Sequence, residues 1–133
     1  QLGRLDDILS RLRVAKRFLV ERLADVPGLE MTRVPDPEGD GGVSLTFLTE
    51  SSERTKRVVD ALNAEGIRVL RQYNGRLLYE QPALRHTALD PAPWCPHSAD
   101  LVGRCVFLGL TTTLSRRDLH DIVTAIRKVM RQT

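Results

Sequence analysis

The feature that most constrains the fold of this chain is an apolar repeat at its beginning, which stops at a strong helix breaker. Apolar residues recur at steps of three and four, the spacing of one helix face: Leu5, Ile8, Leu9, Leu12, Ala15, Leu19 and Leu23. Charged residues such as Arg11 fill the opposite face, and Pro27-Gly28 ends the pattern. Since a helix of about 23 residues spans roughly 35 Å, more than a small domain needs, we expect it to pack against a neighbouring domain.

Length and composition fit one folded domain. The chain has 133 residues, of which 41% are hydrophobic, enough to build a core. No apolar run approaches the roughly 18 residues of a membrane span, and the first residues do not resemble a signal peptide. We therefore expect a soluble, cytoplasmic protein with no membrane partner. Because the chain lacks an initiator methionine and opens directly on helical periodicity, we also expect that its natural beginning lies elsewhere.

The charge balance does not predict a nucleic-acid partner. The 20 Lys and Arg residues exceed the 17 Asp and Glu residues by only three, and 5% of the residues are aromatic. Arg13 and Arg17 of the first helix are interspersed with Asp6, Asp7 and Glu21. A nucleic-acid binder would concentrate its positive charge on one face, beside aromatic side chains. We therefore expect no nucleic acid among the partners.

The middle of the chain predicts a hairpin followed by a helix and a short strand. Residues 29–34 and 43–49 alternate between apolar and polar side chains, which predicts two strands. The turn-rich residues 35–42 lie between them, so we expect the strands to pair. Helical spacing over residues 52–65, capped by one of the two preceding serines and ended by a glycine, predicts a second helix before a strand at 67–70.

The last part of the chain predicts a buried strand and a closing helix. Residues 71–96 have little periodicity. Just beyond them, residues 98–103 are expected to form a helical turn or two. The apolar residues 105–110 predict a strand buried on both faces. Ser115 stands three residues before Asp118, a variant of the capping box, and an amphipathic helix follows it.

This order of elements predicts an α+β fold. We expect a small antiparallel or mixed sheet covered by helices and preceded by a long N-terminal helix. In terms of domains, residues 1–26 would form a linking helix and residues 27–133 the α+β small domain.

The sequence offers no convincing metal site. Cys95, His97 and Cys105 lack an obvious fourth ligand, and their spacing differs from the paired ligands of structural zinc. His120 lies in the final helix, where a surface position is expected, and His86 lies in the aperiodic segment. We therefore predict no metal ligand in this chain.

The sequence also lacks a self-sufficient catalytic group. Cys105 falls in the apolar strand, which indicates a buried thiol, whereas Cys95 lies in the loop and stays open as a nucleophile. With no export signal, both thiols are expected to be reduced and unpaired. Lys16, Lys56 and Lys128 lie on helices among other charges, unlike a shielded lysine prepared for a Schiff base. We therefore predict neither catalytic nor cofactor-binding residues here.

One loop does carry groups suited to binding a ligand. Tyr73, Asn74, Arg76 and Tyr79 lie within seven positions of one another, followed by Glu80. Such groups can hydrogen-bond a hydroxyl-rich substrate, and an arginine can hold a carboxylate with two parallel bonds. Alternatively, this is a surface loop whose tyrosines pack on a partner domain.

Short motifs along almost the whole chain carry a family resemblance. They are Gln1-Leu2-Gly3-Arg4-Leu5-Asp6-Asp7-Ile8-Leu9, Pro27-Gly28-Leu29, Leu62-Asn63-Ala64-Glu65-Gly66-Ile67, Tyr73 to Gln81-Pro82, Cys95-Pro96-His97-Ser98-Ala99-Asp100, and Ser115 to Val129. In this order they resemble the C-terminal small domain of DegT-type (DegT/DnrJ/StrS) aminotransferases. These are fold-type I enzymes that use pyridoxal phosphate (PLP) to aminate keto-sugars and cyclitols.

The resemblance implies a division of labour within a larger enzyme. PLP and the Schiff-base lysine would belong to a missing large domain, on which the long helix packs, in a homodimeric parent. The small domain would close over the active site, with Tyr73, Asn74, Arg76 and Tyr79 as substrate contacts. The family's usual Tyr-x-x-Pro-Leu-His is replaced here, so the loop histidine of some members has no match.

Two other readings of the chain stay open at this point. It could be the non-catalytic partner chain of a split enzyme, which would use the same interface. It could also be a free-standing α+β ligand-binding or regulatory module with a ferredoxin-like sheet, whose first helix packs on its own sheet. The residues do not choose the sugar or cyclitol, the amino donor, or transamination over a dehydration that uses pyridoxamine phosphate.

Overall fold

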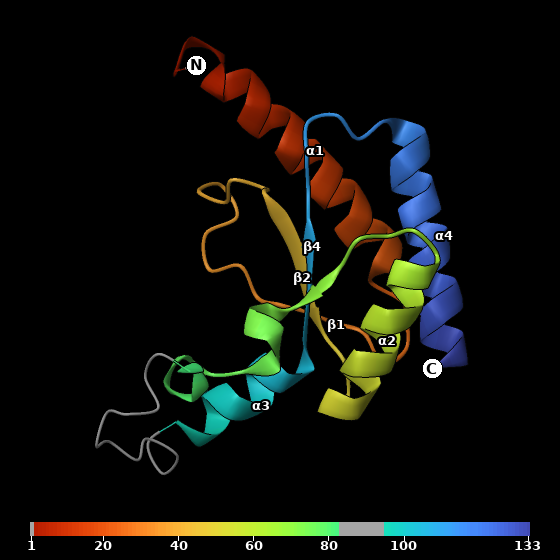
Figure 1. Cartoon of the computed structure of the whole chain (residues 1–133). Helices are drawn as coiled ribbons and strands as arrows, with labels where there is room; N and C mark the ends of the chain where they lie inside the picture. Colours follow the sequence, from red (N-terminus) through yellow and green to blue (C-terminus); the bar gives the residue numbers. More distant parts are fainter. Residues whose placement is uncertain (1, 83–94) are drawn as a thin grey trace.

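Four short strands form one antiparallel sheet with helices packed against it, in a computed structural model that describes residues 2–82 and 95–133 (Figure 1). The helices are α1 (Leu5–Leu23), α2 (Ser52–Ala64), α3 (Pro96–Arg104) and α4 (Arg116–Gln132). The strands are β1 (Glu30–Met31), β2 (Ser44–Leu48), β3 (Leu70–Arg71) and β4 (Cys105–Gly109). Short 3₁₀-helices are η1 (Leu2–Arg4), η2 (Gln72–Gly75) and η3 (Leu78–Glu80). The α+β class, the small sheet and the long first helix are thus as predicted.

The sheet has the order β1-β2-β4-β3, with every neighbouring pair antiparallel. β2 and β4 form its centre, and Leu45 lies opposite Leu108. β1 pairs with β2, so the predicted hairpin is confirmed. β3 lies at the other edge, where Leu70 is opposite Phe107 of β4. Because opposite residues point to the same side of a sheet, Leu70 and Phe107 share one face.

The core lies between one face of β2 and β4 and the apolar faces of α1, α2 and α4. Phe47 and Val106, from the two central strands, are fully buried. The helices bring Leu19, Val58 and Ile126 into the same hydrophobic cluster. Burial of such side chains from both layers stabilises the fold, by roughly 1.5–3 kcal/mol each.

Only part of α1 belongs to this core. Leu12, Ala15, Leu19 and Leu23 are buried, whereas Leu5 is 43% exposed. Figure 1 shows the N-terminal end of α1 projecting past the sheet. The apolar face of the helix therefore continues beyond the surface that it covers here.

The predicted helix starts are formed as local hydrogen-bond caps. Ser51 accepts a hydrogen bond from the backbone N–H of Arg54 at 3.1 Å, which begins α2. Ser115 and Asp118 bond each other's backbone N–H groups, completing the predicted capping box of α4. The hydrogen bonds from Ser115 hold the pKa of Asp118 below its usual value. These caps satisfy N–H groups that a helix leaves unpaired at its first turn.

The loop between β1 and β2 is held against α1 by polar contacts. Lys16 forms an ion pair with Asp40 at 2.5 Å, and Arg13 donates to the Asp40 carbonyl at 2.7 Å. The bond from Lys16 is the main cause that lowers the pKa of the Asp40 carboxyl. Gly42 has φ of +69°, and a Cβ there would lie 2.7 Å from the α1 backbone. The loop therefore touches α1 at a point where only glycine fits.

The strand predicted at residues 67–70 is displaced to Leu70–Arg71. The reason is the side chain of Asn63, near the end of α2, which bonds both the N–H and the carbonyl of Val69. The backbone there is paired with a side chain and not with a neighbouring strand. Similarly, the strand predicted at 29–34 is only Glu30–Met31, because the chain turns out of the sheet before Pro35.

We predict that the two parts of α1 differ in their contribution to stability. Leu19→Ala removes a fully buried side chain, so it should lower the free energy of unfolding by about 2–5 kcal/mol. Leu5→Ala, the matched control on the same helix, should change it by no more than about 0.5 kcal/mol. Urea denaturation of the 133-residue chain measures both. Equal losses would contradict the packing described here.

We also predict that the two cysteines, which are not bonded to each other, differ in reactivity. Cys105 is buried, and burial raises its pKa, so little thiolate is present near neutral pH. With a thiol reagent such as DTNB, Cys105 should react at least about tenfold more slowly than the half-buried Cys95. Cys95→Ser isolates the slow thiol, and guanidinium should abolish the difference. A fast reaction of Cys105 in the folded chain would refute this assignment.

Candidate functional site

The four residues predicted to bind substrate lie on one short segment beside the β3 edge of the sheet. Tyr73 and Asn74 belong to η2, Arg76 follows it directly, and Tyr79 lies in η3. Tyr73 is 66% exposed, and Asn74 and Arg76 are also exposed, whereas Tyr79 is half-buried. The segment contacts α3, so it lies between the sheet edge and that helix. The structure thus gathers these groups in one place, and their substrate role stays a prediction.

The backbone of this segment turns in the left-handed direction. Three consecutive residues have positive φ: Tyr73 at 50°, Asn74 at 58° and Gly75 at 69°. The N–H of Arg76 donates to the carbonyl of Tyr73 at 3.2 Å and closes the turn. A left-handed conformation costs roughly 1–2 kcal/mol for a residue with a side chain, less for asparagine. Such backbone conformations gather at functional sites, which supports this turn as a candidate site.

Residues on both sides of the turn fix it to the fold. Arg71, the last residue of β3, donates from Nη2 to Ser52 Oγ of α2 at 3.0 Å. Leu77 is buried, and its N–H donates to the carboxylate of Glu80 at 2.6 Å. The exposed side chains therefore stand on an anchored segment. The sequence pattern did not single out Arg71, because its bond to Ser52 joins residues 19 positions apart in the chain.

Exposed apolar side chains accompany this segment. Leu70 on β3, Leu78 on η3 and Leu101 on α3 are large and exposed. The elements that carry Leu70 and Leu101 contact each other and η2. A surface that joins apolar side chains with hydroxyl, amide and guanidinium groups suits either a ligand or a second protein surface.

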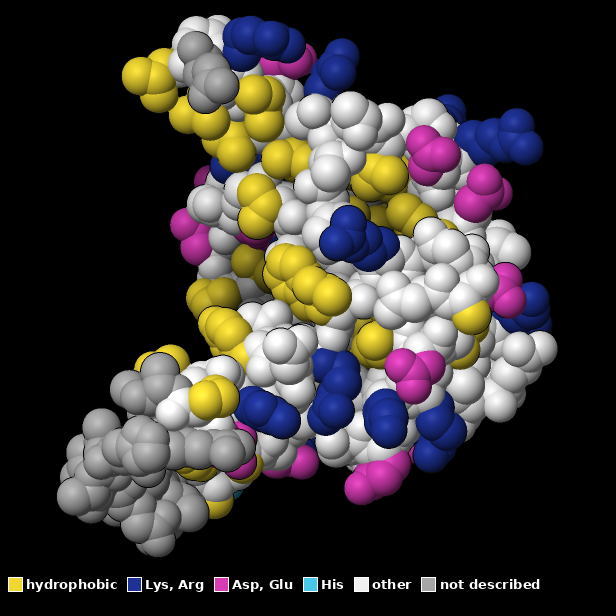
Figure 2. Space-filling view, viewed as in Figure 1, with side chains coloured by type: hydrophobic (Ala, Val, Ile, Leu, Met, Phe, Trp, Pro, Cys, Tyr) yellow, Lys and Arg dark blue, Asp and Glu magenta, His cyan; other side chains and the backbone are white. Residues whose placement is uncertain are grey.

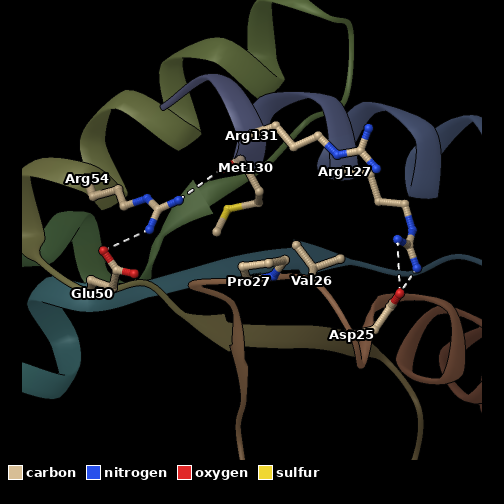
Figure 3. Close-up of a pocket in the computed structure, with 8 residues that line it drawn as sticks. All are labelled: Asp25, Val26, Pro27, Glu50, Arg54, Arg127, Met130 and Arg131. Carbon is tan, nitrogen blue, oxygen red and sulfur yellow. Dashed lines mark hydrogen bonds and ion pairs between the residues drawn. The ribbon is translucent and has the colours of Figure 1, made fainter.

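A hollow of about 530 Å³ opens between the end of α1 and helices α2 and α4 (Figure 3). Its lining residues are Asp25, Val26, Pro27, Glu50, Arg54, Arg127, Met130 and Arg131. Three arginines in one hollow suggest an anion site. Whether the hollow can bind an anion depends on the contacts that these arginines already make.

Two of the three arginines of this hollow, Arg54 and Arg127, join helices. Arg127 donates to the carbonyl of Arg22 at the end of α1 and pairs with Asp25, which lowers the pKa of the Asp25 carboxyl. Arg54 donates to the carbonyl of Met130 at 2.9 Å. Both guanidinium groups thereby satisfy carbonyls at helix C-termini. The hollow is therefore a structural joint, which disfavours it as a ligand site.

Arg54 is held especially firmly in this joint. Its side chain is only 14% exposed and pairs with Glu50 at 2.9 Å. It also lies against Gly28, since a Cβ there would lie 2.3 Å from Arg54 Nη1. Gly28 has φ of +74°, so glycine suits this position in both backbone and space.

The described residues contain neither a candidate metal site nor a candidate membrane-spanning helix. In 2–82 and 95–133, no three His, Cys, Asp or Glu side chains come together in a way that could hold a metal ion. His86 lies outside the described residues. Within the same ranges, no helix has the length and apolar character needed to cross a membrane.

The three lysines of the chain lie on helices, and two of them are ion-paired. Lys16 is paired with Asp40 and Lys128 with Glu65, and Lys56 is exposed on α2. A lysine that forms a Schiff base must lose its proton in a shielded site. Whether any of these lysines could do so is taken up with the proposed function.

Comparisons with solved structures place this fold among aminotransferases. A DegT/DnrJ/EryC1/StrS aminotransferase from Brucella abortus is 25% identical, with a TM-score of 0.77 over 96% of this chain and 32% of that protein. DesV from S. venezuelae, solved with a ketimine intermediate, is 20% identical, with a TM-score of 0.84. The match covers 99% of this chain and 34% of that protein. 3-Amino-5-hydroxybenzoic acid (AHBA) synthase is 19% identical, with a TM-score of 0.84. The match covers 100% of this chain and 37% of that protein.

This chain therefore spans about a third of the length of the solved proteins that it matches. The model of the DegT/DnrJ/EryC1/StrS aminotransferase family matches residues 1–127, which is nearly the whole chain. The chain belongs to the DegT/DnrJ/EryC1/StrS aminotransferase family.

Proposed function

We propose that this chain is the C-terminal small domain of a PLP-dependent aminotransferase that acts on a keto-sugar or a cyclitol. The observation that carries the proposal is the family match over residues 1–127, in a chain that covers about a third of the matched structures. A domain of this size supplies walls and contacts to an active site whose cofactor lies elsewhere. In this role it closes over the substrate and excludes water.

In this proposal the cofactor is held by residues outside the chain. PLP, when bound, supplies the electron sink that lets an amino group move between carbon skeletons. The ion pairs of Lys16 and Lys128 and the exposure of Lys56 support this placement of the cofactor. The 133-residue chain alone would therefore be inactive.

The proposed substrate contacts are Tyr73, Asn74, Arg76 and Tyr79. A hydroxyl, an amide and a guanidinium group match the many hydroxyls of a sugar or cyclitol and any anionic group it carries. The exposure of Tyr73, Asn74 and Arg76 leaves these groups accessible. The anchored backbone on which they stand supports a binding role, because a preorganised contact loses less entropy on binding.

The exposed part of α1 is the proposed contact with the large domain. Leu5 and Val14 of α1 and Leu2 of the preceding η1 are exposed, and Figure 2 shows hydrophobic side chains gathered at the projecting end of the helix, at the upper left. Residues 1–26 would then serve as the linking helix and residues 27–133 as the small domain. A homodimeric, cytoplasmic enzyme is part of the same proposal.

Two observations bear on the alternative of a free-standing module. Leu12 and Leu19 are buried within the domain, as that alternative requires. However, the order β-β-α-β-α-β-α after α1 differs from the β-α-β-β-α-β of a ferredoxin-like domain. A split enzyme would use the same surfaces as a single chain, so it differs only in having two polypeptides.

We predict that PLP does not form a Schiff base with this chain alone. The purified 133-residue protein mixed with PLP should show no lysine-dependent absorbance at roughly 410–430 nm beyond that of a Lys16→Arg, Lys56→Arg, Lys128→Arg control. The longer enzyme that contains this chain should show the band. A band in the isolated chain that disappears with one lysine substitution would refute the proposal.

We also predict that the turn side chains act on the amino acceptor. In the longer enzyme, Tyr73→Phe and Asn74→Gly each remove one hydrogen-bonding group, and glycine still tolerates the left-handed backbone. Each should raise the KM for the keto-sugar or keto-cyclitol that a panel of ketones identifies as acceptor, by about 3- to 10-fold.

The control for this prediction is Arg117→Met, at a side chain that is 91% exposed on α4. It should leave KM unchanged. If Tyr73→Phe and Asn74→Gly behave like this control, the turn does not contact the acceptor.

A further inference from the structure

We propose that Arg71 is the positioning residue of the left-handed turn Tyr73–Asn74–Gly75, and that Ser52 of α2 is its anchor. In this assignment the Arg71 guanidinium packs against the turn at Gly75 and fixes the orientation in which Tyr73 and Asn74 contact the substrate. The inference rests on the proposed substrate role of the turn. It adds two residues that do not themselves contact the substrate.

The first observation is the path of the Arg71 side chain. Arg71 lies opposite Val106 in the sheet, so its backbone is fixed by pairing with β4. Its side chain is half-buried and reaches α2, where Nη2 donates to Ser52 Oγ at 3.0 Å. The side chain therefore connects the sheet edge to the first residue of a core helix.

The second observation is the contact between this side chain and the turn. A Cβ built on Gly75 would lie 2.3 Å from Arg71 Nη2 and 2.5 Å from its Cζ. The guanidinium thus occupies the space that a side chain at position 75 would need. Gly75 also has a positive φ, so this position requires glycine both for its backbone and for the arginine beside it.

The third observation is that the anchor is itself held in place. Ser52 begins α2, whose residues Val58 and Leu62 are fully buried in the core. On its other side, α3 approaches closely, since a Cβ on Gly103 would lie 3.4 Å from Ser52 Cβ. Ser52 is therefore held in place between two helices. Because Arg71 bonds to Ser52 and lies against Gly75, it holds the turn in a fixed position relative to these helices.

These contacts explain how an unfavourable backbone can persist at an exposed position. Two residues with side chains, Tyr73 and Asn74, adopt a left-handed conformation, which requires compensation from surrounding contacts. The Arg71 guanidinium lies directly against the third residue of this turn. Without it, we expect the turn to sample other conformations and to present Tyr73 and Asn74 less often in the orientation that binds.

Amide hydrogen exchange tests the positioning directly in the 133-residue chain. Arg71→Met should accelerate exchange across residues 72–77 by about 3- to 10-fold, the effect of losing roughly one hydrogen bond. Ser52→Ala, a smaller change that removes only the anchor, should accelerate the same peptide. Arg68→Met is the matched control, because Arg68 is an exposed arginine three residues earlier with no hydrogen bond or ion pair within the described residues.

Kinetics of the longer enzyme separate positioning from general stability. Arg71→Met and Ser52→Ala should raise the KM for the acceptor found in the ketone panel, by about 3- to 10-fold. They should leave the rate of the half-reaction with the amino donor unchanged, as should Arg68→Met. A loss of stability alone would instead lower the amount of active enzyme, with KM unaffected.

The outcomes distinguish this inference from the proposed function. Unchanged exchange in both Arg71→Met and Ser52→Ala overturns the positioning role, whatever the kinetics. Faster exchange with an unchanged KM also overturns it, while Tyr73→Phe and Asn74→Gly with a raised KM still support the substrate role of the turn. If none of these four substitutions changes KM, the substrate role fails and the inference fails with it.

Discussion

Burial of one face of β2 and β4 beneath three helices is the interaction on which the rest of this structure depends. Phe47 and Val106 have no exposed surface, and Leu19 and Ile126 cover them from α1 and α4 within one cluster. The opposite face of the sheet is covered less, since it carries Leu70, which is exposed. The features that suit binding, namely the β3 edge, the turn after it and the projecting end of α1, lie outside this core.

The parts of the fold that follow from burial could be predicted from the sequence. The first and last helices each bury one stripe, so their apolar spacing marked them correctly, and the capping box marked where α4 starts. Strand limits could not be predicted in this way. Asn63 takes over the backbone groups of Val69, and that depends on how the end of α2 approaches the next segment.

The candidate site was predictable in composition but not in shape. A cluster of Tyr, Asn and Arg side chains is visible in the sequence, and the structure places them on one anchored turn. The left-handed conformation of Tyr73 was not predictable from the local residue types, and the support that we propose for it requires Arg71 to meet Ser52 across the fold. Residue type alone would also have misled elsewhere in the chain. Arg54 and Arg127 line a hollow, as residues of an anion site would, but they serve as links between helices.

In the proposed enzyme, a small domain contributes an anchored turn to an active site whose cofactor is held outside this chain. A crystal structure of the longer enzyme with its aminated sugar or cyclitol product bound tests this most directly. We predict that Tyr73 Oη or the Asn74 amide lies within about 3.2 Å of a product oxygen or nitrogen. A structure in which the turn instead packs against the large domain, with both side chains buried there and away from the product, would contradict it.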